Sequence, residues 1–353
     1  MKKPLLLVLF VFTVLGASRG AHSQDFAFTP PTRLAGEPLA YPELARRIGL
    51  EALIFCSFNV AEDGSVQDYE VHYSTNTPEI EDHIREWILG QRYEPAVRDG
   101  KAIPWRMFRT LRFALTNKER GASRYFGKNY RSLTRELQSG NLEKVRELLN
   151  RLDGVNNRSL YEELFLQRAW ADYEDASGNS DGAYARRKVV AAFYRSNADV
   201  DAAIATPEFY FQPFVEKYRY EAQHLMLGDA QRTLQALRNI APTESATSAV
   251  ADHLRQVVDA ADGIDVPIEA ELRESFSRGQ TALWDTWLFR RAFRFAAVDG
   301  ALDRVSLYCD TEQTELQSSW VLERFVVPES YGDCRLYVAG EPGTSFTLMQ
   351  LAD

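Results

Sequence analysis

The sequence is poor in the side chains and motifs on which most enzymes and metal sites depend. Its 353 residues include 5 histidines and 3 cysteines, with the histidines scattered and no Cys-x-x-Cys pair. Because zinc sites draw on closely spaced cysteine and histidine pairs, a metal site is disfavoured. A His-Glu-x-x-His motif, a phosphate-binding glycine loop and a dinucleotide fingerprint are also missing. The sequence therefore predicts no catalytic residue, no metal and no cofactor, and a protein that is not an enzyme.

An excess of positive charge is lacking as well. The chain has 41 Lys and Arg against 50 Asp and Glu, a formal net charge of −9. Proteins that bind nucleic acid or anionic membranes broadly need a basic face. We therefore expect no nucleic-acid partner. The length leaves room for two or three domains, each with a core of its own.

Long apolar runs are confined to the N-terminus. Lys2-Lys3 precede an apolar stretch from Leu5 to Leu15, and Ala21 and Ser23 stand at positions −3 and −1 of a cut before Gln24. This layout predicts a secretory signal peptide over residues 1–23 and a periplasmic protein. The alternative is an uncleaved anchor, but the run is shorter than the roughly 20 residues that span a bilayer. After cleavage no stable membrane span is expected.

The three cysteines predict one disulfide and one free thiol. In an oxidising compartment Cys309 and Cys334 are the natural pair. Cys56 lies on the apolar face of an alternating strand and is expected to be a buried free thiol.

Residues 24–40 read as an extended leader, and residues 41–118 as a first domain of helix, hairpin, helix and strand. Asp63-Gly64 supplies the positive φ values of a tight hairpin turn. The expected elements are a helix from Tyr41 to Ile48, strands Ala52–Val60 and Val66–Tyr73, a helix between Thr77 and Gly90, and a strand from Trp105 to Leu115.

The order of signals in this domain resembles the C-terminal domain of the TonB energy-transducer family. The matching positions are Tyr41-Pro42, Gly49, Phe58, Asp63-Gly64, Val66, Tyr93, Pro95-Ala96 and Gly100. The resemblance implies a small α+β unit whose strand edge pairs with an extended segment of an envelope protein, such as an outer-membrane receptor. An edge strand allows this because its N–H and C=O groups are unpaired. The implied receiving edge is formed by Arg106, Met107, Phe108, Arg109, Thr110, Leu111 and Arg112.

The chain also departs from that family. Ala52 stands where a glycine is usual, and the 23 residues between Ala17 and Tyr41 reach at most about 80 Å. An energy transducer needs an inner-membrane anchor and an arm that crosses the periplasm. Force transduction is therefore the alternative function here, and binding of a peptide or protein partner is the expected one.

Residues 119–264 change to charged, alanine-bearing helices with turns at Gly140-Asn141, Gly178-Asn179 and Gly228-Asp229. They resemble degenerate tetratricopeptide-like hairpins, and a plain helical bundle is an equal alternative because the turn spacing is irregular.

Residues 265–353 turn to short strands and predict an antiparallel β sandwich or barrel. Two hairpins are expected, one around Asp299-Gly300 and one around Pro342-Gly343. Cys309 and Cys334 would tie these hairpins together.

The fold class predicted is thus a multidomain α+β protein with three parts. The expected function is that of an exported, non-catalytic protein that binds a partner segment by strand addition. A composite active site between the parts is the other alternative, and it would require a polar cleft with titratable groups of shifted pKa.

Overall fold

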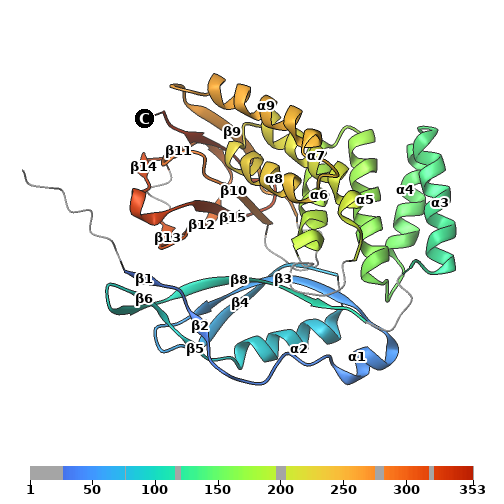
Figure 1. Ribbon diagram of the computed structural model, residues 1–353, viewed down its shortest axis with the longest axis horizontal. Coiled ribbons are helices and arrows are strands. Elements are labelled where there is room, and N and C mark those ends of the chain that lie inside the picture. The colour runs from blue at the N-terminus through green and yellow to red at the C-terminus, as the bar shows by residue number, and fades with distance from the viewer. Residues whose placement is uncertain are drawn as a thin grey trace, which may run out of the picture.

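The computed structural model describes residues 27–75, 77–115, 121–195, 204–274, 282–317 and 322–352. The predicted signal peptide and the first residues of the leader lie outside these ranges. The chain forms three parts, an N-terminal sheet with two helices, a set of helices, and a C-terminal group of strands (Figure 1). The structure is mixed α+β, as predicted.

The N-terminal part is built on a three-stranded antiparallel sheet of order β4-β3-β8. Its helices α1 and α2 lie against one face of the sheet (Figure 1). Two short sheets, β1-β6-β7 and β2-β5, complete it. The elements are β1 Phe28–Thr29, β2 Thr32–Arg33, α1 Glu43–Ile48, β3 Ala52–Val60, β4 Val66–Ser74, α2 Pro78–Leu89, β5 Tyr93–Glu94, β6 Ala96–Arg98, β7 Lys101–Ile103 and β8 Trp105–Phe113.

The alternation of apolar residues explains this packing. Ile54, Cys56 and Phe58 of β3 are buried against Ile80 and Ile84 of α2. The hairpin turn between β3 and β4 falls at Asp63-Gly64, as predicted. Gly64 has φ +78, and a Cβ there would lie 2.0 Å from the Tyr93 carbonyl oxygen, so the turn needs glycine for both reasons.

The helical part consists of α3 to α9, and each helix packs against its neighbour in sequence. Their bounds are α3 Arg124–Gln138, α4 Leu142–Asp153, α5 Leu160–Ala176, α6 Ser180–Arg195, α7 Pro207–Gln223, α8 Leu227–Ile240 and α9 Ser245–Ala260. Within the described ranges no helix is long and apolar enough to cross a membrane. The assignment to a repeat family stays a prediction.

One predicted turn in this part is displaced. The turn between α7 and α8 falls at His224–Met226, where Leu225 has φ 56, and Gly228 already lies inside α8. A Cβ on Gly228 would lie 2.3 Å from the Trp287 carbonyl oxygen. This glycine therefore lets α8 approach β10 rather than making a turn.

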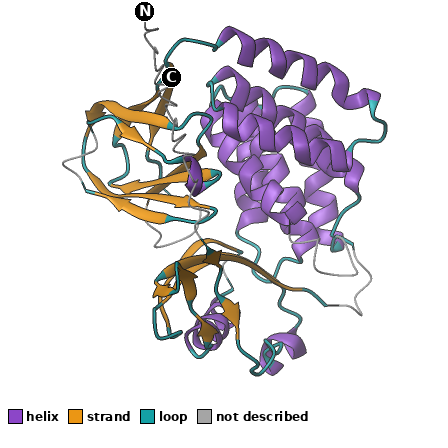
Figure 2. Cartoon of the chain, turned by 60° about the vertical axis from the view of Figure 1, so that its left-hand side comes forward, coloured by secondary structure: helices purple, strands orange, loops and turns teal. Residues whose placement is uncertain are grey.

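The C-terminal part is a sandwich of two four-stranded antiparallel sheets, of orders β10-β15-β12-β13 and β14-β11-β16-β9. The strands lie beside the helices, above the N-terminal sheet (Figure 2). Their bounds are β9 Val266–Glu271, β10 Ala282–Trp287, β11 Ala292–Asp299, β12 Leu302–Cys309, β13 Gln313–Leu316, β14 Phe325–Val326, β15 Cys334–Gly340 and β16 Ser345–Gln350.

Neither predicted hairpin of this part forms. The strands before and after Asp299-Gly300, β11 and β12, belong to different sheets, and so do β15 and β16 on either side of Pro342-Gly343. The turn signals were correct, but each turn crosses the sandwich because apolar faces of both strands must point into the space between the sheets.

The predicted disulfide is present. Cys309 and Cys334 are opposite each other on the neighbouring strands β12 and β15, so the bond lies within one sheet and does not join two hairpins. Cys56 is free and buried, as expected.

Candidate functional site

β8 is an edge strand with an unbroken register. Its nine residues pair with β3 from Val60↔Trp105 to Ala52↔Phe113 without a shift. The opposite edge strand, β4, pairs with β3 through two irregularities, and its Asp68 has φ 54. Bulged edges resist pairing with another chain, whereas a regular edge is a template for it. β8 is therefore the more regular of the two edges of this sheet.

One peptide group of the β8 edge is already occupied. The Arg106 backbone N–H donates to the Gln313 side-chain Oε1 at 2.6 Å, and Gln313 Nε2 donates to the Arg106 carbonyl at 2.8 Å. A side-chain amide thus makes the pair of bonds that a neighbouring strand would make. Gln313 begins β13 of the C-terminal part.

This contact fixes which groups of β8 face outward. In an antiparallel ladder the paired groups of successive residues point alternately to the two sides. Because the Arg106 groups point to Gln313, those of Phe108, Thr110 and Arg112 point the same way. The groups of Met107 bond to β3.

The predicted arginines occupy three different environments. Arg106 is buried, and its guanidinium donates to Ser57 Oγ at 3.0 Å and pairs with Glu70. Arg304 of the C-terminal part pairs with the same Glu70 at 3.0 Å. The Arg106 side chain is therefore turned to its own protein, and only its backbone lies at the edge. Arg109 is exposed, whereas Arg112 is partly buried.

Two cavities lie where the three parts meet. The first, of about 660 Å³, is lined by Trp105, Arg106, Met107 and Phe108 of β8 together with α6, α7, α8 and the C-terminal strands. The second, of about 690 Å³, lies along β4. Both are lined by Phe55, Lys188, Arg195 and Tyr337. Of the predicted edge residues, Arg109, Thr110, Leu111 and Arg112 do not line either cavity.

Aromatic rings form the wall between β8 and the C-terminal part. The Phe108 ring stacks on Tyr337 with centroids 5.1 Å apart, and Tyr308 meets Phe108 edge-on at 5.2 Å. Tyr337 is 5% exposed, and its hydroxyl is buried without a hydrogen-bond partner. A hydroxyl in that state is a ready donor to an incoming ligand.

A charged cluster lies beside this wall. Asp285 of β10 pairs with Lys188 of α6 and with Arg335 of β15. Burial alone would raise the pKa of Asp285, but the Arg335 and Lys188 cations outweigh it and hold that pKa well below its usual range. The carboxylate is therefore charged at any physiological pH.

Two further carboxylates are buried in the helical part. Burial raises the pKa of both Glu221 and Asp229, which lie near the Lys217 ammonium. Asp229 accepts from the Thr286 hydroxyl at 2.6 Å and from the Trp287 N–H at 3.1 Å. These bonds hold α8 against β10. Asp229 therefore connects the helical part to the C-terminal part.

Ser57 and His72 have the spacing of a nucleophile and a base. Ser57 Oγ lies 2.7 Å from His72 Nε2, on neighbouring strands. Ser57 is 0% exposed and does not line either cavity between the parts. Because a nucleophile must reach its substrate, this bond orients His72 and Arg106 and is not a catalytic pair.

A sequence motif typical of hydrolases lies at the start of α6. Residues Gly178-Asn179-Ser180-Asp181-Gly182 have the Gly-x-Ser-x-Gly spacing of a hydrolase nucleophile turn. That turn requires a preceding strand, and here helix α5 precedes it. Asn179 Oδ1 accepts from the Gly182 N–H at 3.1 Å, so the segment begins a helix. In the described ranges no group of His, Cys, Asp and Glu could hold a metal ion.

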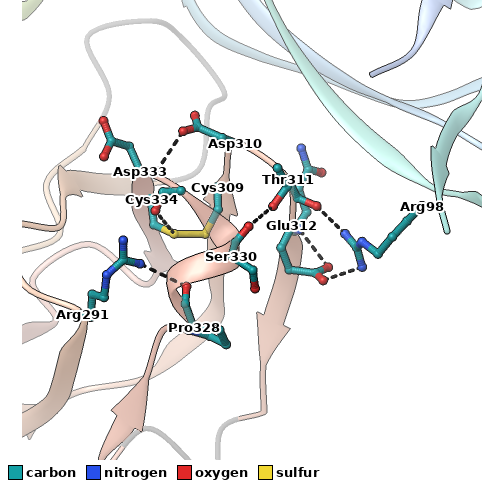
Figure 3. Close-up of a disulfide and its surroundings, with 12 residues drawn as sticks. Arg98, Arg291, Cys309, Asp310, Thr311, Glu312, Pro328, Ser330, Asp333 and Cys334 are labelled. Atoms are coloured by element: carbon teal, nitrogen blue, oxygen red, sulfur yellow. Dashed lines mark hydrogen bonds and ion pairs between the residues drawn. A yellow bond between two sulfur atoms is a disulfide. The ribbon is translucent and has the colours of Figure 1, made fainter. Parts of the chain in front are cut away.

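The disulfide anchors the turn that precedes Gln313 (Figure 3). Within this turn Thr311 donates to the Ser330 carbonyl at 2.6 Å. Arg98 of β6 donates to the Thr311 carbonyl at 2.6 Å and pairs with Glu312. The turn from Asp310 to Gln313 is thus one of the segments of the C-terminal sandwich that contact the N-terminal part.

The comparisons with known proteins concern the sheet that contains β8. Residues 37–115 match the family described as Gram-negative bacterial TonB protein C-terminal. These residues form a TonB-like domain. The solution NMR structure of the Pseudomonas aeruginosa TonB CTD is similar to this chain at 22% identity, covering 28% of this chain and 95% of that chain, with a TM-score of 0.23. None of the curated proteins matches.

Four residues of the site were not predicted. Glu70 and Gln313 surround the Arg106 end of β8, and Arg195 and Tyr337 line both cavities. They come from β4, β13, α6 and β15, which meet only when the parts pack against the TonB-like domain. No spacing along the chain could have indicated them.

Proposed function

We propose that this protein is an exported envelope protein that binds an extended segment of another protein by adding it as a strand to β8. The observation that carries the proposal is the Gln313 amide on the Arg106 peptide group. It supports the proposal because the Gln313 side-chain amide, which comes from outside this sheet, makes the two hydrogen bonds that a partner strand would make with Arg106. The match of residues 37–115 to the TonB C-terminal family adds support.

The space beside β8 suits such a segment. The first cavity borders Trp105 to Phe108 and continues between α6, α7, α8 and the C-terminal strands. Its wall of aromatic rings would cover the side chains on one face of an added strand. In this reading the helical and C-terminal parts select the partner, and the TonB-like domain supplies the backbone pairing. The role is binding and not catalysis.

The test uses the full chain and a synthetic peptide of alternating valine and threonine, of about nine residues, the length of β8. Replacing Thr110 by proline removes an outward N–H, which edge strands tolerate. We expect Thr110→Pro to weaken peptide binding by about 10-fold or more. Thr110→Val keeps the N–H and is expected to bind like the wild type. Calorimetric titration measures both.

A second measurement leaves the protein unchanged. Methyl groups placed on successive backbone nitrogens of the peptide should block binding at every other position, because only alternate N–H groups face β8. Equal binding of all methylated peptides would refute strand addition. So would unaltered binding to a folded Thr110→Pro variant.

A further inference from the structure

The lining of the first cavity is rich in cationic side chains. Its lining includes six cationic side chains, Arg106, Lys188, Arg195, Lys217, Arg232 and Arg335, against the three carboxylates of Asp229, Asp310 and Asp333. The chain as a whole has a net charge of −9. The cationic lining is therefore a local feature and not a reflection of composition.

Five of these six cations are paired with a carboxylate. The pairs are Arg106 with Glu70, Lys188 and Arg335 with Asp285, Lys217 with Glu221, and Arg232 with Asp333. Arg195 is the remaining cation, and it has no hydrogen bond or ion pair with any residue that the structure describes. Lys188, Arg195 and Arg335 together thus face the single carboxylate of Asp285.

Arg195 lies where a ligand can reach it. It ends α6, is exposed, and lines both cavities, so solvent reaches its side chain. Its contacts with protein and the nearby Arg335 cation lower the pKa of Arg195. The guanidinium is still charged at neutral pH and would gain from an added anion.

Tyr337 supplies an independent observation at the same place. It lines both cavities, is 5% exposed, and its buried hydroxyl has no hydrogen-bond partner. Arg195 lines the same two cavities as Tyr337, and its cation acts to lower the pKa of the Tyr337 hydroxyl, which burial raises. An unpaired cation and an unpaired buried donor in the same cavity are what a carboxylate or another oxyanion requires.

We propose that Arg195 and Tyr337 form a carboxylate-binding subsite, and that the segment added to β8 carries an acidic side chain or a C-terminal carboxylate that enters it. This inference rests on the proposed strand addition, because one cavity joins Trp105–Phe108 of β8 to Arg195 and Tyr337. It goes further by naming the chemistry of the partner. A guanidinium and a phenol hydroxyl would bind the two carboxylate oxygens, while the rings of Phe108 and Tyr308 cover the chain beside it.

The experiment moves a single glutamate along the alternating valine–threonine peptide, with a glutamine version of each peptide as its match. We expect one glutamate position to bind the wild-type chain about 10- to 100-fold more tightly than its glutamine match. Arg195→Gln and Tyr337→Phe should each reduce this preference, while binding of the glutamine peptides stays the same. Arg255→Gln, a change at an exposed arginine of α9, is the matched control.

The outcomes separate the two proposals. If glutamine peptides bind but glutamate gives no preference at any position, the subsite is refuted and strand addition stands. If glutarate alone raises the Tm of the wild type and not of Arg195→Gln, without a glutamate preference, the site binds a small free anion and the proposal is wrong. If no peptide binds and glutarate has no effect, both proposals fail.

Discussion

At the scale of single residues, His72 is a titratable side chain packed among aromatic rings. Its ring centroid lies 5.1 Å from that of Phe55 and 5.8 Å from that of Phe108. Burial lowers the pKa of His72 from 6.5 to about 4, with Glu70 and Asp285 raising it and Arg106 and Arg335 lowering it. The imidazole is therefore neutral in the folded protein at pH 7, and it shares a hydrogen bond with the Ser57 hydroxyl.

This shift predicts a specific sensitivity to acid. As pH falls below 6.5 the unfolded chain protonates His72 first, so stability is lost between about pH 6.5 and pH 4 and is constant below that. We expect the free energy of unfolding to drop by about 1–2 kcal/mol more in the wild type than in His72→Gln between pH 7.5 and pH 5, the ring being partly exposed. Urea unfolding at the two pH values measures the difference. His253→Gln, at an exposed histidine, should behave like the wild type, and an equal drop in His72→Gln would contradict the assignment.

At the scale of elements, the contact of α8 with β10 joins the helical part to the C-terminal part. Gly228 in the first turn of α8 leaves room for the Trp287 carbonyl, and Asp229 beside it accepts from Thr286 and Trp287. Arg232, one turn further on, lies over the Trp287 ring at 3.4 Å. Two consecutive turns of α8 thus contact the end of β10.

Substituting alanine for this glycine tests the contact. A Cβ at residue 228 would lie 2.3 Å from a backbone oxygen that cannot move aside freely. We expect Gly228→Ala to lower the free energy of unfolding by about 1–3 kcal/mol, measured by urea denaturation. Gly127→Ala in α3 meets only the end of Arg131 at 3.4 Å and should raise stability by up to about 1 kcal/mol. A Gly228→Ala variant as stable as the wild type would show that the contact is loose.

The sequence predicted individual helices and strands better than it predicted how they pack. Both helices and all three long strands of the TonB-like domain follow from local signals, such as the Asp63-Gly64 turn and the Ile80, Ile84, Ile88 stripe. The hairpins of the C-terminal part were wrong, since a turn signal does not reveal which sheet the next strand will join. Of the site, the sequence indicated β8 through a resemblance. It could not indicate Gln313 or Arg195, whose positions depend on how the three parts pack.

At the scale of the whole molecule, the TonB-like sheet is enclosed on two sides. The face of the sheet that α1 and α2 leave uncovered contacts the helical part through Leu53 and Tyr73. On the same sheet, Phe108 contacts Tyr308 of the C-terminal sandwich. The end of β8 is held by Gln313. A strand added to β8 as proposed would therefore compete with Gln313 for the Arg106 peptide group.

Removing this competitor should strengthen binding. We expect Gln313→Ala to bind the valine–threonine peptide about 10-fold more tightly than the wild type, because two hydrogen bonds no longer have to be exchanged. Calorimetric titration again gives the affinity. Gln138→Ala changes the same residue type at an exposed position of α3 that lines neither cavity, and it should leave the affinity as it is. Weaker binding in Gln313→Ala would mean that Gln313 contacts the partner instead of competing with it.

The separation of Arg106 and Gln313 along the chain has a consequence during synthesis of the protein. The two residues are 207 positions apart, so β8 is complete long before its cap has been made. At a synthesis rate of roughly 5–20 residues per second, the interval is about 10–40 s. Throughout it the Arg106 peptide group lacks its Gln313 partner, because Gln313 has not yet been made.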